Sequence, residues 1–336
     1  MADVSIIGTG TWGIALGIVL AQNGHQVTAW SAIPAEIEQL KETYTCKNLP
    51  GVAIPKEIVF TADLKEACTG KKMLVMSVPS VYTRRVARQM KPFIADGQLI
   101  VDVAKGVEEG TLMTLSQQIE QEIPQANVAV LSGPSHAEEV SRGIPTSCVA
   151  GAHDRQTAQE VQNLFMSPVF RIYTSPDMIG IELGGALKNV IALAAGISDG
   201  LGCGDNTKAA LMTRGIAEIT RLGMKMGGHA QTFAGLSGIG DLIVTCTSMH
   251  SRNRRAGILI GQGKSMKEAM DEVQMVVEGV YSAKAALELG KKYGVSMPIV
   301  EQVNEILFDG KSPETALMEL MCRDKTAEAD YSSVSW

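Results

Sequence analysis

The sequence predicts an α/β fold in which a mostly parallel, doubly wound β-sheet is followed by an all-helical C-terminal region. Three observations support this. Short apolar runs alternate with helical stretches over residues 1–177, a glycine-rich turn joins the first run to the first helical stretch, and strand patterns stop after Pro176. Strands that alternate with helices imply parallel strands covered on both faces. We therefore expect two domains, 1–177 and 178–323, and a polar, frayed tail at 324–336.

The expected elements follow from the spacing of apolar residues and from the turn residues between them. Strands are expected at 4–7, 26–30, 73–77, 99–103, 128–131, 147–150 and 170–174. Helices are expected between and after them at 12–23, 35–41, 81–90, 110–122 and 154–166. In the second domain, helical stretches broken by glycine are expected at 179–199, 206–226, 252–261, 266–272, 279–293, 298–308 and 312–321.

Composition narrows the class of protein. The 336 residues are 45% hydrophobic and 20% charged, which is typical of a globular protein long enough for two domains. A net charge of −6 gives no reason to expect nucleic acid or an anionic membrane as a partner. Six scattered cysteines without a CxxC pair argue against a disulfide framework or a metal site. No basic N-terminal region and no apolar run of bilayer length are evident, so we expect a cytoplasmic protein without an integral membrane segment.

The turn after the first expected strand reads Gly8-Thr9-Gly10-Thr11-Trp12-Gly13 and opens a helix. In this context a GxGxxG pattern indicates a dinucleotide site. Its first glycine permits the tight turn, its second the approach of a pyrophosphate, and its third the packing of helix on strand. The alternative is a tight turn without a ligand. At the end of the second strand, Ser31 and Ala32 provide neither an acid for NAD nor an arginine for NADP, so we expect both cofactors to serve.

The helical stretch from Gly184 to Gly196 is apolar on almost every side except at Lys188 and Asn189. Such a helix is usually buried, and no acid lies three or four residues from Lys188 to pair with it. A buried, unpaired lysine has a lowered pKa that suits proton transfer. The alternative is that Lys188 extends from a buried helix to water. The small residues Gly184, Gly185 and Ala186 leave room for another group to approach and favour a functional role.

Two further groups follow expected strands, where ligands bind in sheets of this kind. Lys105 comes just after the strand at 99–103, although a solvated loop lysine is an equal alternative. The segment 132–138 follows the next strand. Within it Ser135 and Glu138 fit a capping box, which is the alternative to a ligand contact by Ser135. His136 is more simply explained by packing.

The helical half contains two more candidates. A glycine-rich turn at 235–240 leads to Asp241, which either caps a helix or belongs to a site. The run 251–255, Ser-Arg-Asn-Arg-Arg, is either a solvated basic face or a phosphate site. In the second case Ser251 caps a helix whose first turn contains Arg252 and Asn253, because helix N-termini and arginine both bind phosphate well.

Together these motifs resemble the bacterial-type NAD(P)-dependent glycerol-3-phosphate dehydrogenases over nearly the whole chain. The resemblance rests on segments 8–13, 103–108, 132–140, 184–215, 235–246, 251–255 and 276–279, of which 184–215 and 251–255 are the most specific. It implies a Rossmann-type domain followed by an all-helical substrate domain, often in a homodimer. It also implies reduction of dihydroxyacetone phosphate to sn-glycerol 3-phosphate with NAD(P)H, which supplies phospholipid synthesis.

The resemblance also implies roles for individual residues. Lys188 is the expected proton donor and acceptor, with Lys105 and Asp241 beside it. The expected substrate-binding residues are Lys105, Gly133, Ser135, Lys188, Asp241, Ser251, Arg252 and Asn253. The expected cofactor-binding residues are Gly8, Gly10, Thr11, Trp12, Gly13, Lys105, Ala137, Arg252, Val276 and Glu278. The sequence departs from many family members at Ala32, near which an arginine or histidine is common.

Two other functions remain open at this point. The first is another two-domain dehydrogenase that acts on a β-hydroxy acid or a sugar acid, in which case the basic run at 251–255 would need a different role. The second is a nucleotide-binding sensor without catalysis. Such a sensor could lose its lysines, and the presence of both Lys105 and Lys188 argues against it.

Overall fold

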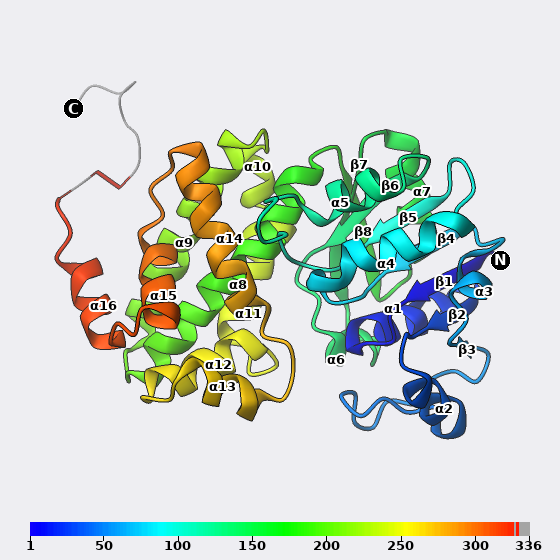
Figure 1. Ribbon diagram of the computed structural model, residues 1–336, viewed down its shortest axis with the longest axis horizontal. Helices are drawn as coiled ribbons and strands as arrows, with labels where there is room; N and C mark the ends of the chain where they lie inside the picture. Colours follow the sequence, from blue (N-terminus) through cyan, green and yellow to red (C-terminus); the bar gives the residue numbers. More distant parts are fainter. Residues whose placement is uncertain (326, 329–336) are drawn as a thin grey trace.

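The structure is a computed structural model that describes residues 1–325 and 327–328. A β-sheet flanked by helices forms one half, and helices alone form the other (Figure 1). The last strand ends at Ser175, and the first helix of the helical half begins at Met178. Most of the expected tail, residues 326 and 329–336, lies outside the described residues.

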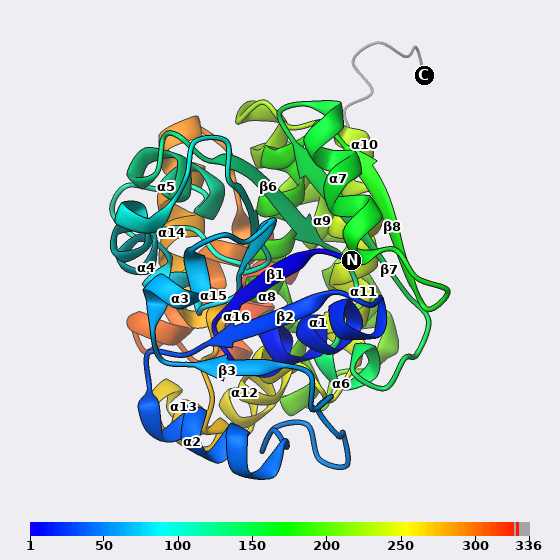
Figure 2. The ribbon, with the colours of Figure 1, turned by 90° about the vertical axis from the view of Figure 1, so that its right-hand side faces the viewer.

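The sheet has eight strands in the order β3-β2-β1-β4-β5-β6-β7-β8, and all neighbours are parallel except β6 and β7. This confirms the predicted mostly parallel sheet. Figure 2 shows β1, β2 and β3 side by side. The strands are β1 (Asp3–Ile7), β2 (Gln26–Trp30), β3 (Val59–Thr61), β4 (Met73–Met76), β5 (Leu99–Asp102), β6 (Asn127–Ser132), β7 (Thr146–Ala152) and β8 (Phe170–Ser175). Strand β3 was not expected, because three residues are too short to show a periodic pattern.

Helices cover both faces of the sheet. One face packs against α1 (Thr11–Gln22), α2 (Pro34–Thr43), α6 (Ala137–Val140) and α7 (Arg155–Phe165). The other packs against α3 (Leu64–Cys68), α4 (Thr83–Met90) and α5 (Leu115–Glu122). Because each face carries its own buried apolar cluster, the sheet is doubly wound, as expected.

The helix expected at 110–122 is wrong in its first turn, because α5 begins only at Leu115. Gly110 and Leu112 have φ angles of 88° and 62°, which a right-handed helix does not allow. The chain instead makes an isolated bridge between Val107 and Thr114. Thr114 then starts α5 in a capping box with Gln117.

The helical half is built around α8 (Met178–Gly200), which contacts most of the other helices. These are α9 (Asp205–Lys225), α10 (Ala230–Phe233), α11 (Asp241–Thr247), α12 (Arg252–Gly261), α13 (Met266–Val273), α14 (Glu278–Tyr293), α15 (Pro298–Phe308) and α16 (Pro313–Met321). A π-helical turn, η3 (Leu236–Gly240), precedes α11. Seven of these elements match the expected helices within two residues, whereas α10, η3 and α11 had not been given bounds.

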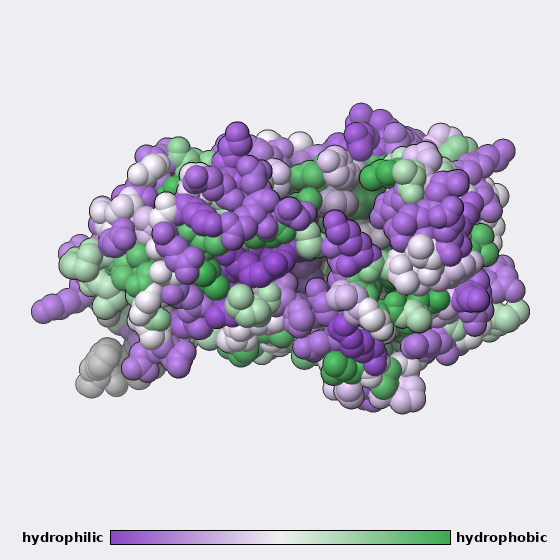
Figure 3. Space-filling view, turned by 90° about the horizontal axis from the view of Figure 1, so that it is seen from below, coloured by the Kyte–Doolittle hydropathy of each residue, from purple (hydrophilic) through white to green (hydrophobic). Residues whose placement is uncertain are grey.

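Helix α8 corrects the expectation that the chain contains no apolar run of bilayer length. With 23 residues and a mean hydropathy of 1.5 over its most apolar window, it is long and apolar enough to cross a membrane. However, 94% of that window is buried inside the protein, which is typical of a core helix. The surface seen from below is mostly hydrophilic, with hydrophobic residues in small separate areas (Figure 3).

Glycines allow α8 and α12 to pack backbone against backbone. A Cβ atom on Gly196 would lie 2.1 Å from the carbonyl oxygen of Arg254, and one on Gly257 would lie 2.2 Å from that of Leu193. Gly200 and Gly261, one turn further along, are equally close to the opposite helix. Any larger side chain at these positions would force the helices apart.

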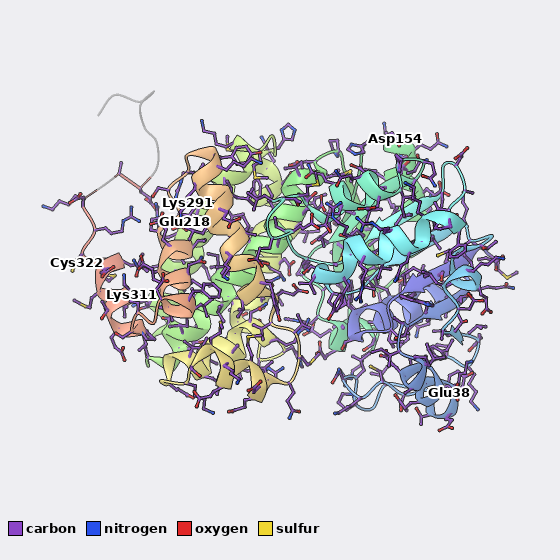
Figure 4. All side chains as sticks on the ribbon, in the orientation of Figure 1. Glu38, Asp154, Glu218, Lys291, Lys311 and Cys322 are labelled. Atoms are coloured by element: carbon purple, nitrogen blue, oxygen red, sulfur yellow. The ribbon has the colours of Figure 1, made fainter. Side chains whose placement is uncertain are left out.

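A buried carboxylate on α9 gives the fold a measurable pH dependence. Glu218 is 3% exposed and accepts a hydrogen bond of 2.9 Å from the backbone N–H of Ile299, at the start of α15 (Figure 4). Burial raises its pKa from 4.5 to about 7, although this hydrogen bond opposes the shift. The folded state therefore binds the proton more tightly than the unfolded state, and the resulting stability is lost as the pH rises from about 4.5 through 7.

We predict that Glu218→Gln removes this loss, because glutamine can still accept from Ile299 but carries no charge. Relative to the unsubstituted protein, its free energy of unfolding should improve by roughly 1–3 kcal/mol between pH 5 and pH 8. Denaturant unfolding at the two pH values measures this difference. Glu288→Gln, at an exposed position on α14, serves as the control and should show no such trend. Parallel behaviour of the two variants would contradict the prediction.

Candidate active site

The centre of the site is the carboxylate of Asp241, which is 1% exposed and binds two lysines. One carboxylate oxygen accepts from Lys105 Nζ at 2.6 Å, and the other accepts from Lys188 Nζ. Lys188 is only 6% exposed, so the alternative in which it extends to water is wrong. Asp241 lies in the first turn of α11 and makes no capping hydrogen bond, so the capping alternative is wrong as well.

Two glycines of α8 explain how these side chains meet. A Cβ atom on Gly184 would lie 2.5 Å from the carbonyl oxygen of Ser237, so only glycine lets η3 pack against α8. The η3 turn leads directly into Asp241, the first residue of α11. Because Lys188 lies about one helical turn after Gly184 on α8, Asp241 comes to the level of Lys188. A Cβ atom on Gly185 would lie 2.8 Å from Ser132 Oγ and 3.5 Å from Lys105 Cγ. The room expected at these small residues is therefore used by the protein itself.

The charges of the cluster shift the pKa values of its members. Burial lowers the pKa of Lys188 below its ordinary value of 10.5; Asp241 opposes this shift, and the neighbouring Lys105 adds to it. Burial alone would raise the pKa of Asp241, but the two ammonium groups outweigh it and hold that pKa below 3.8. An amine with a lowered pKa, held beside a permanent carboxylate, is well suited to exchange a proton.

One member of the cluster was not identified from the sequence. Thr245 Oγ1 accepts from Lys188 Nζ at 2.7 Å and donates to the carbonyl oxygen of Asp241 at 2.6 Å. It lies four residues after Asp241 on α11, so the two face the same side of that helix. The i, i+4 spacing was the available signal, and it becomes informative only once Asp241 is known to be buried.

The segment after β6 contributes backbone to the same place. Gly133 has a φ of 154°, and its carbonyl oxygen accepts from Lys105 Nζ at 3.1 Å and from Ser135 Oγ at 2.9 Å. Ser135 does not cap α6, whose N-cap is His136, so the capping box expected with Glu138 is wrong. His136 packs near the ring of His250, and burial lowers its pKa.

The run at 251–255 forms the start of α12, as expected. Ser251 Oγ accepts from the backbone N–H of Arg254 and caps the helix. Asn253 is held between helices: its Nδ2 donates to Asn189 Oδ1 at 2.9 Å, and its Oδ1 accepts from Gly279 N at 2.8 Å. The side chain of Arg252, in contrast, has no hydrogen-bond partner in the described part of the chain. Its guanidinium is thus available to a ligand.

The glycine-rich turn fits the pyrophosphate of a dinucleotide. A Cβ atom on Gly8 would lie 2.9 Å from the backbone of Ser77, and one on Gly13 would lie 2.1 Å from the carbonyl oxygen of Gly8, so both positions require glycine. Gly10 faces open space at the N-terminus of α1, where no side chain caps the helix. Free N–H groups in an open glycine turn bind phosphate. Thr11 and Trp12, both half-buried, form the first turn of α1.

The other expected cofactor residues come from elements around this turn. Ala137 begins α6, which packs against α1. Val276 is half-buried and precedes α14. Glu278, at the start of α14, crosses to the sheet half, where Ser80 Oγ donates to its Oε2 at 2.6 Å. Ser80, which follows β4, is a second partner that the sequence did not reveal.

Comparison with known proteins places these features in a family. The model for the N-terminal part of NAD-dependent glycerol-3-phosphate dehydrogenase matches residues 3–158, and the model for the C-terminal part matches residues 177–318. The chain belongs to this family. The N-terminal match contains the glycine turn, Lys105 and Gly133, and the C-terminal match contains Lys188, Asp241 and Arg252.

Individual family members agree over the full length. Glycerol-3-phosphate dehydrogenase [NAD(P)+] of Agathobacter rectalis is 60% identical, and both chains are covered completely. The enzyme of the same name from Fusobacterium nucleatum is 59% identical over 98% of this chain and 99% of its own. The crystal structure of glycerol-3-phosphate dehydrogenase from Coxiella burnetii superimposes with a TM-score of 0.93 at 36% identity, covering 96% of this chain and 99% of the other.

The buried cluster leads to a prediction about stability. Asp241→Asn should cost about 3–5 kcal/mol at pH 6, because two ammonium groups would lose the carboxylate that pairs with both. This loss of stability should be smaller at pH 9 than at pH 6. Without Asp241, the pKa of Lys188 in the folded variant falls further below its value in the unfolded chain, so the folded variant releases the proton of Lys188 as the pH rises and no longer buries an unpaired charge. Denaturant unfolding at both pH values measures it.

The double variant Asp241→Asn/Lys188→Met provides the control. Removing the second buried charge should restore more than half of the lost stability, since the two substitutions affect one interaction. Additive losses in the double variant would show that Asp241 stabilises the fold independently of Lys188.

Proposed function

We propose that this chain interconverts dihydroxyacetone phosphate and sn-glycerol 3-phosphate by hydride transfer with NAD(P)H and so supplies glycerol 3-phosphate for phospholipid synthesis. The observation that supports it most is the buried Lys105–Asp241–Lys188 cluster, which lies where the carboxyl ends of β5 and β6 meet α8. Membership of the glycerol-3-phosphate dehydrogenase family, with 60% identity over the whole chain, supports the same substrate.

The residues suggest how the reaction proceeds. The bound nicotinamide supplies the hydride. Lys188 donates a proton to the oxygen that becomes negative as the ketone is reduced, and Lys105 stabilises that charge beside it. Both oxygens of Asp241 are occupied by lysines, which supports a role in orienting them rather than in binding a substrate hydroxyl.

The phosphate is assigned to the start of α12. Arg252 has no partner in the described residues, and the capped N-terminus of the helix adds positive potential. Asn253 keeps a second N–H on Nδ2 beyond the one that binds Asn189. Because the carbonyl carbon is covalently joined to the phosphate, fixing the phosphate there restricts where the carbonyl carbon can lie. We assign Gly133 and Ser135 to the same substrate, since their segment adjoins Lys105.

The two alternatives are weaker on this structure. A β-hydroxy acid would offer Arg252 a carboxylate in place of the phosphate, whereas membership of the glycerol-3-phosphate dehydrogenase family supports a phosphorylated substrate. A nucleotide sensor would not require a buried lysine with a lowered pKa beside a carboxylate. A substrate panel followed at 340 nm distinguishes all three functions.

We assign residues 1–177 to dinucleotide binding and 178–323 to substrate binding. The cofactor residues are those of the glycine turn together with Ala137, Val276 and Glu278, while Lys105 and Arg252 serve both ligands. Family membership supports a homodimer and a cytoplasmic location. Light scattering of the purified protein tests the dimer.

We predict that Lys188→Ala lowers kcat by about two to four orders of magnitude, the range expected when a positioned acid is removed. Cofactor affinity should stay near normal, because the hydrogen bonds of the Lys188 side chain in the described residues go to Asp241 and Thr245 and not to the glycine turn. Steady-state rates with dihydroxyacetone phosphate and fluorescence titration with NADH measure the two quantities. Lys225→Ala, exposed at the end of α9, is the control. Turnover retained in the Lys188 variant would refute the assignment.

A second prediction concerns the phosphate. Arg252→Ala should reduce kcat/KM for dihydroxyacetone phosphate, because it removes a charge-assisted hydrogen bond. The reduction should correspond to a loss of about 2–4 kcal/mol in transition-state stabilisation. Dihydroxyacetone, which lacks the phosphate, should be a poor substrate that the substitution hardly affects. Comparing the two substrates gives the answer: an equal loss on both would mean that Arg252 acts through the cofactor or the fold rather than through the phosphate.

A further inference from the structure

A carboxylate lies at the end of β2 although the strand itself ends without one. Ser31, the residue after the strand, is 6% exposed, and its Oγ donates to Glu36 Oε2 at 2.6 Å. The same Oγ accepts from the backbone N–H of Ile33 at 3.2 Å, so the hydroxyl is fixed in direction. Glu36 belongs to the first turn of α2 and is half-buried. Helix α2 thus places an acid beside the end of β2, where the strand itself has none.

This place adjoins the glycine turn. Gly8 N donates to the carbonyl oxygen of Trp30, the last residue of β2, at 2.9 Å. In sheets of this type the adenosine ribose of a dinucleotide lies between the glycine turn and the end of the second strand. A carboxylate there accepts from the ribose 2′-hydroxyl and repels a 2′-phosphate.

The neighbouring strand strengthens the negative charge. Thr61, the last residue of β3, donates from Oγ1 to Glu66 Oε2 at 2.5 Å. Strands β2 and β3 are adjacent and parallel, so both carboxylates lie along the same edge of the sheet. No lysine or arginine occurs from Ser31 to Glu36 to offset them.

We propose that Glu36 is the residue that sets cofactor preference, by accepting from the 2′-hydroxyl of NAD and repelling the 2′-phosphate of NADP. This rests on the proposed dinucleotide site. It revises the expectation from Ser31 and Ala32 that the end of β2 discriminates little, because the discriminating group comes from α2.

The test uses two fragments that differ only at the 2′ position, 5′-ADP and 2′-phosphoadenosine 5′-diphosphate, which share the 5′-diphosphate. Calorimetric titration gives both Kd values for the full-length protein. We expect 5′-ADP to bind at least tenfold more tightly, roughly one charge-assisted interaction. Glu36→Gln should reduce that ratio about tenfold, mainly by tighter binding of the 2′-phosphorylated fragment, and Ser31→Ala should reduce it in part.

Glu38→Gln is the matched control, since it makes the same charge change on the same helix at an exposed position (Figure 4). Equal Kd values for the two fragments in the unsubstituted protein, or equal changes in the Glu36 and Glu38 variants, would overturn the proposal. Rates with dihydroxyacetone phosphate are measured in parallel. A shifted binding ratio without turnover would support Glu36 and refute the proposed substrate, whereas turnover with an unchanged ratio would refute Glu36 alone.

Discussion

The interaction on which the site depends is the sharing of one buried carboxylate by two ammonium groups. Asp241 neutralises only one of the charges of Lys105 and Lys188, so the cluster retains net positive charge away from bulk water. An excess positive charge at low dielectric is costly in the free protein, and an anionic substrate or a developing oxyanion relieves that cost. Burial lowers the pKa of Lys188, with a further contribution from Lys105, and the excess positive charge of the cluster prepares the site for negative charge.

Glycines in α8 make this arrangement possible. Lysine is rarely buried, and here it is buried because α8 is enclosed on every side by elements that approach its backbone. Gly184 admits η3 with Asp241, Gly185 admits Lys105 and Ser132, and Gly196 admits the backbone of α12. The contacts at Gly184 and Gly196 are with the backbone of another element, and the contact at Gly185 is with two side chains. The helix is consequently both the core of the helical half and the platform for the site.

The sequence predicted the parts of this structure that depend on local patterns. The apolar residues on almost every side of α8 predicted the burial of Lys188, and the GxGxxG pattern predicted the tight turn between β1 and α1. The partner of Lys188 could not be predicted from spacing, because Asp241 is 53 residues away and the contact depends on how η3 packs. The capping box at Ser135 failed because α6 has His136, one residue later, as its N-cap, while the Ser135 hydroxyl donates to the carbonyl oxygen of Gly133. Glu36 was not predicted because the acid that binds the ribose is expected at the end of the second strand itself. Here the acid comes from the following helix and reaches the strand end through Ser31.

The residues of the site are also among those that join the two halves of the molecule. Lys105 and Asp241 make one polar link, and Ser80 and Glu278 make a second. A third joins α8 to α5, where Glu182 accepts from the N–H and the hydroxyl of Ser116. In the first two links the groups proposed to bind ligands also hold the halves together. A ligand that competes for Lys105 or Glu278 must therefore replace an interdomain contact with its own. Binding and the relative position of the halves are thus thermodynamically coupled, because a ligand shifts a conformational equilibrium only through such differential contacts.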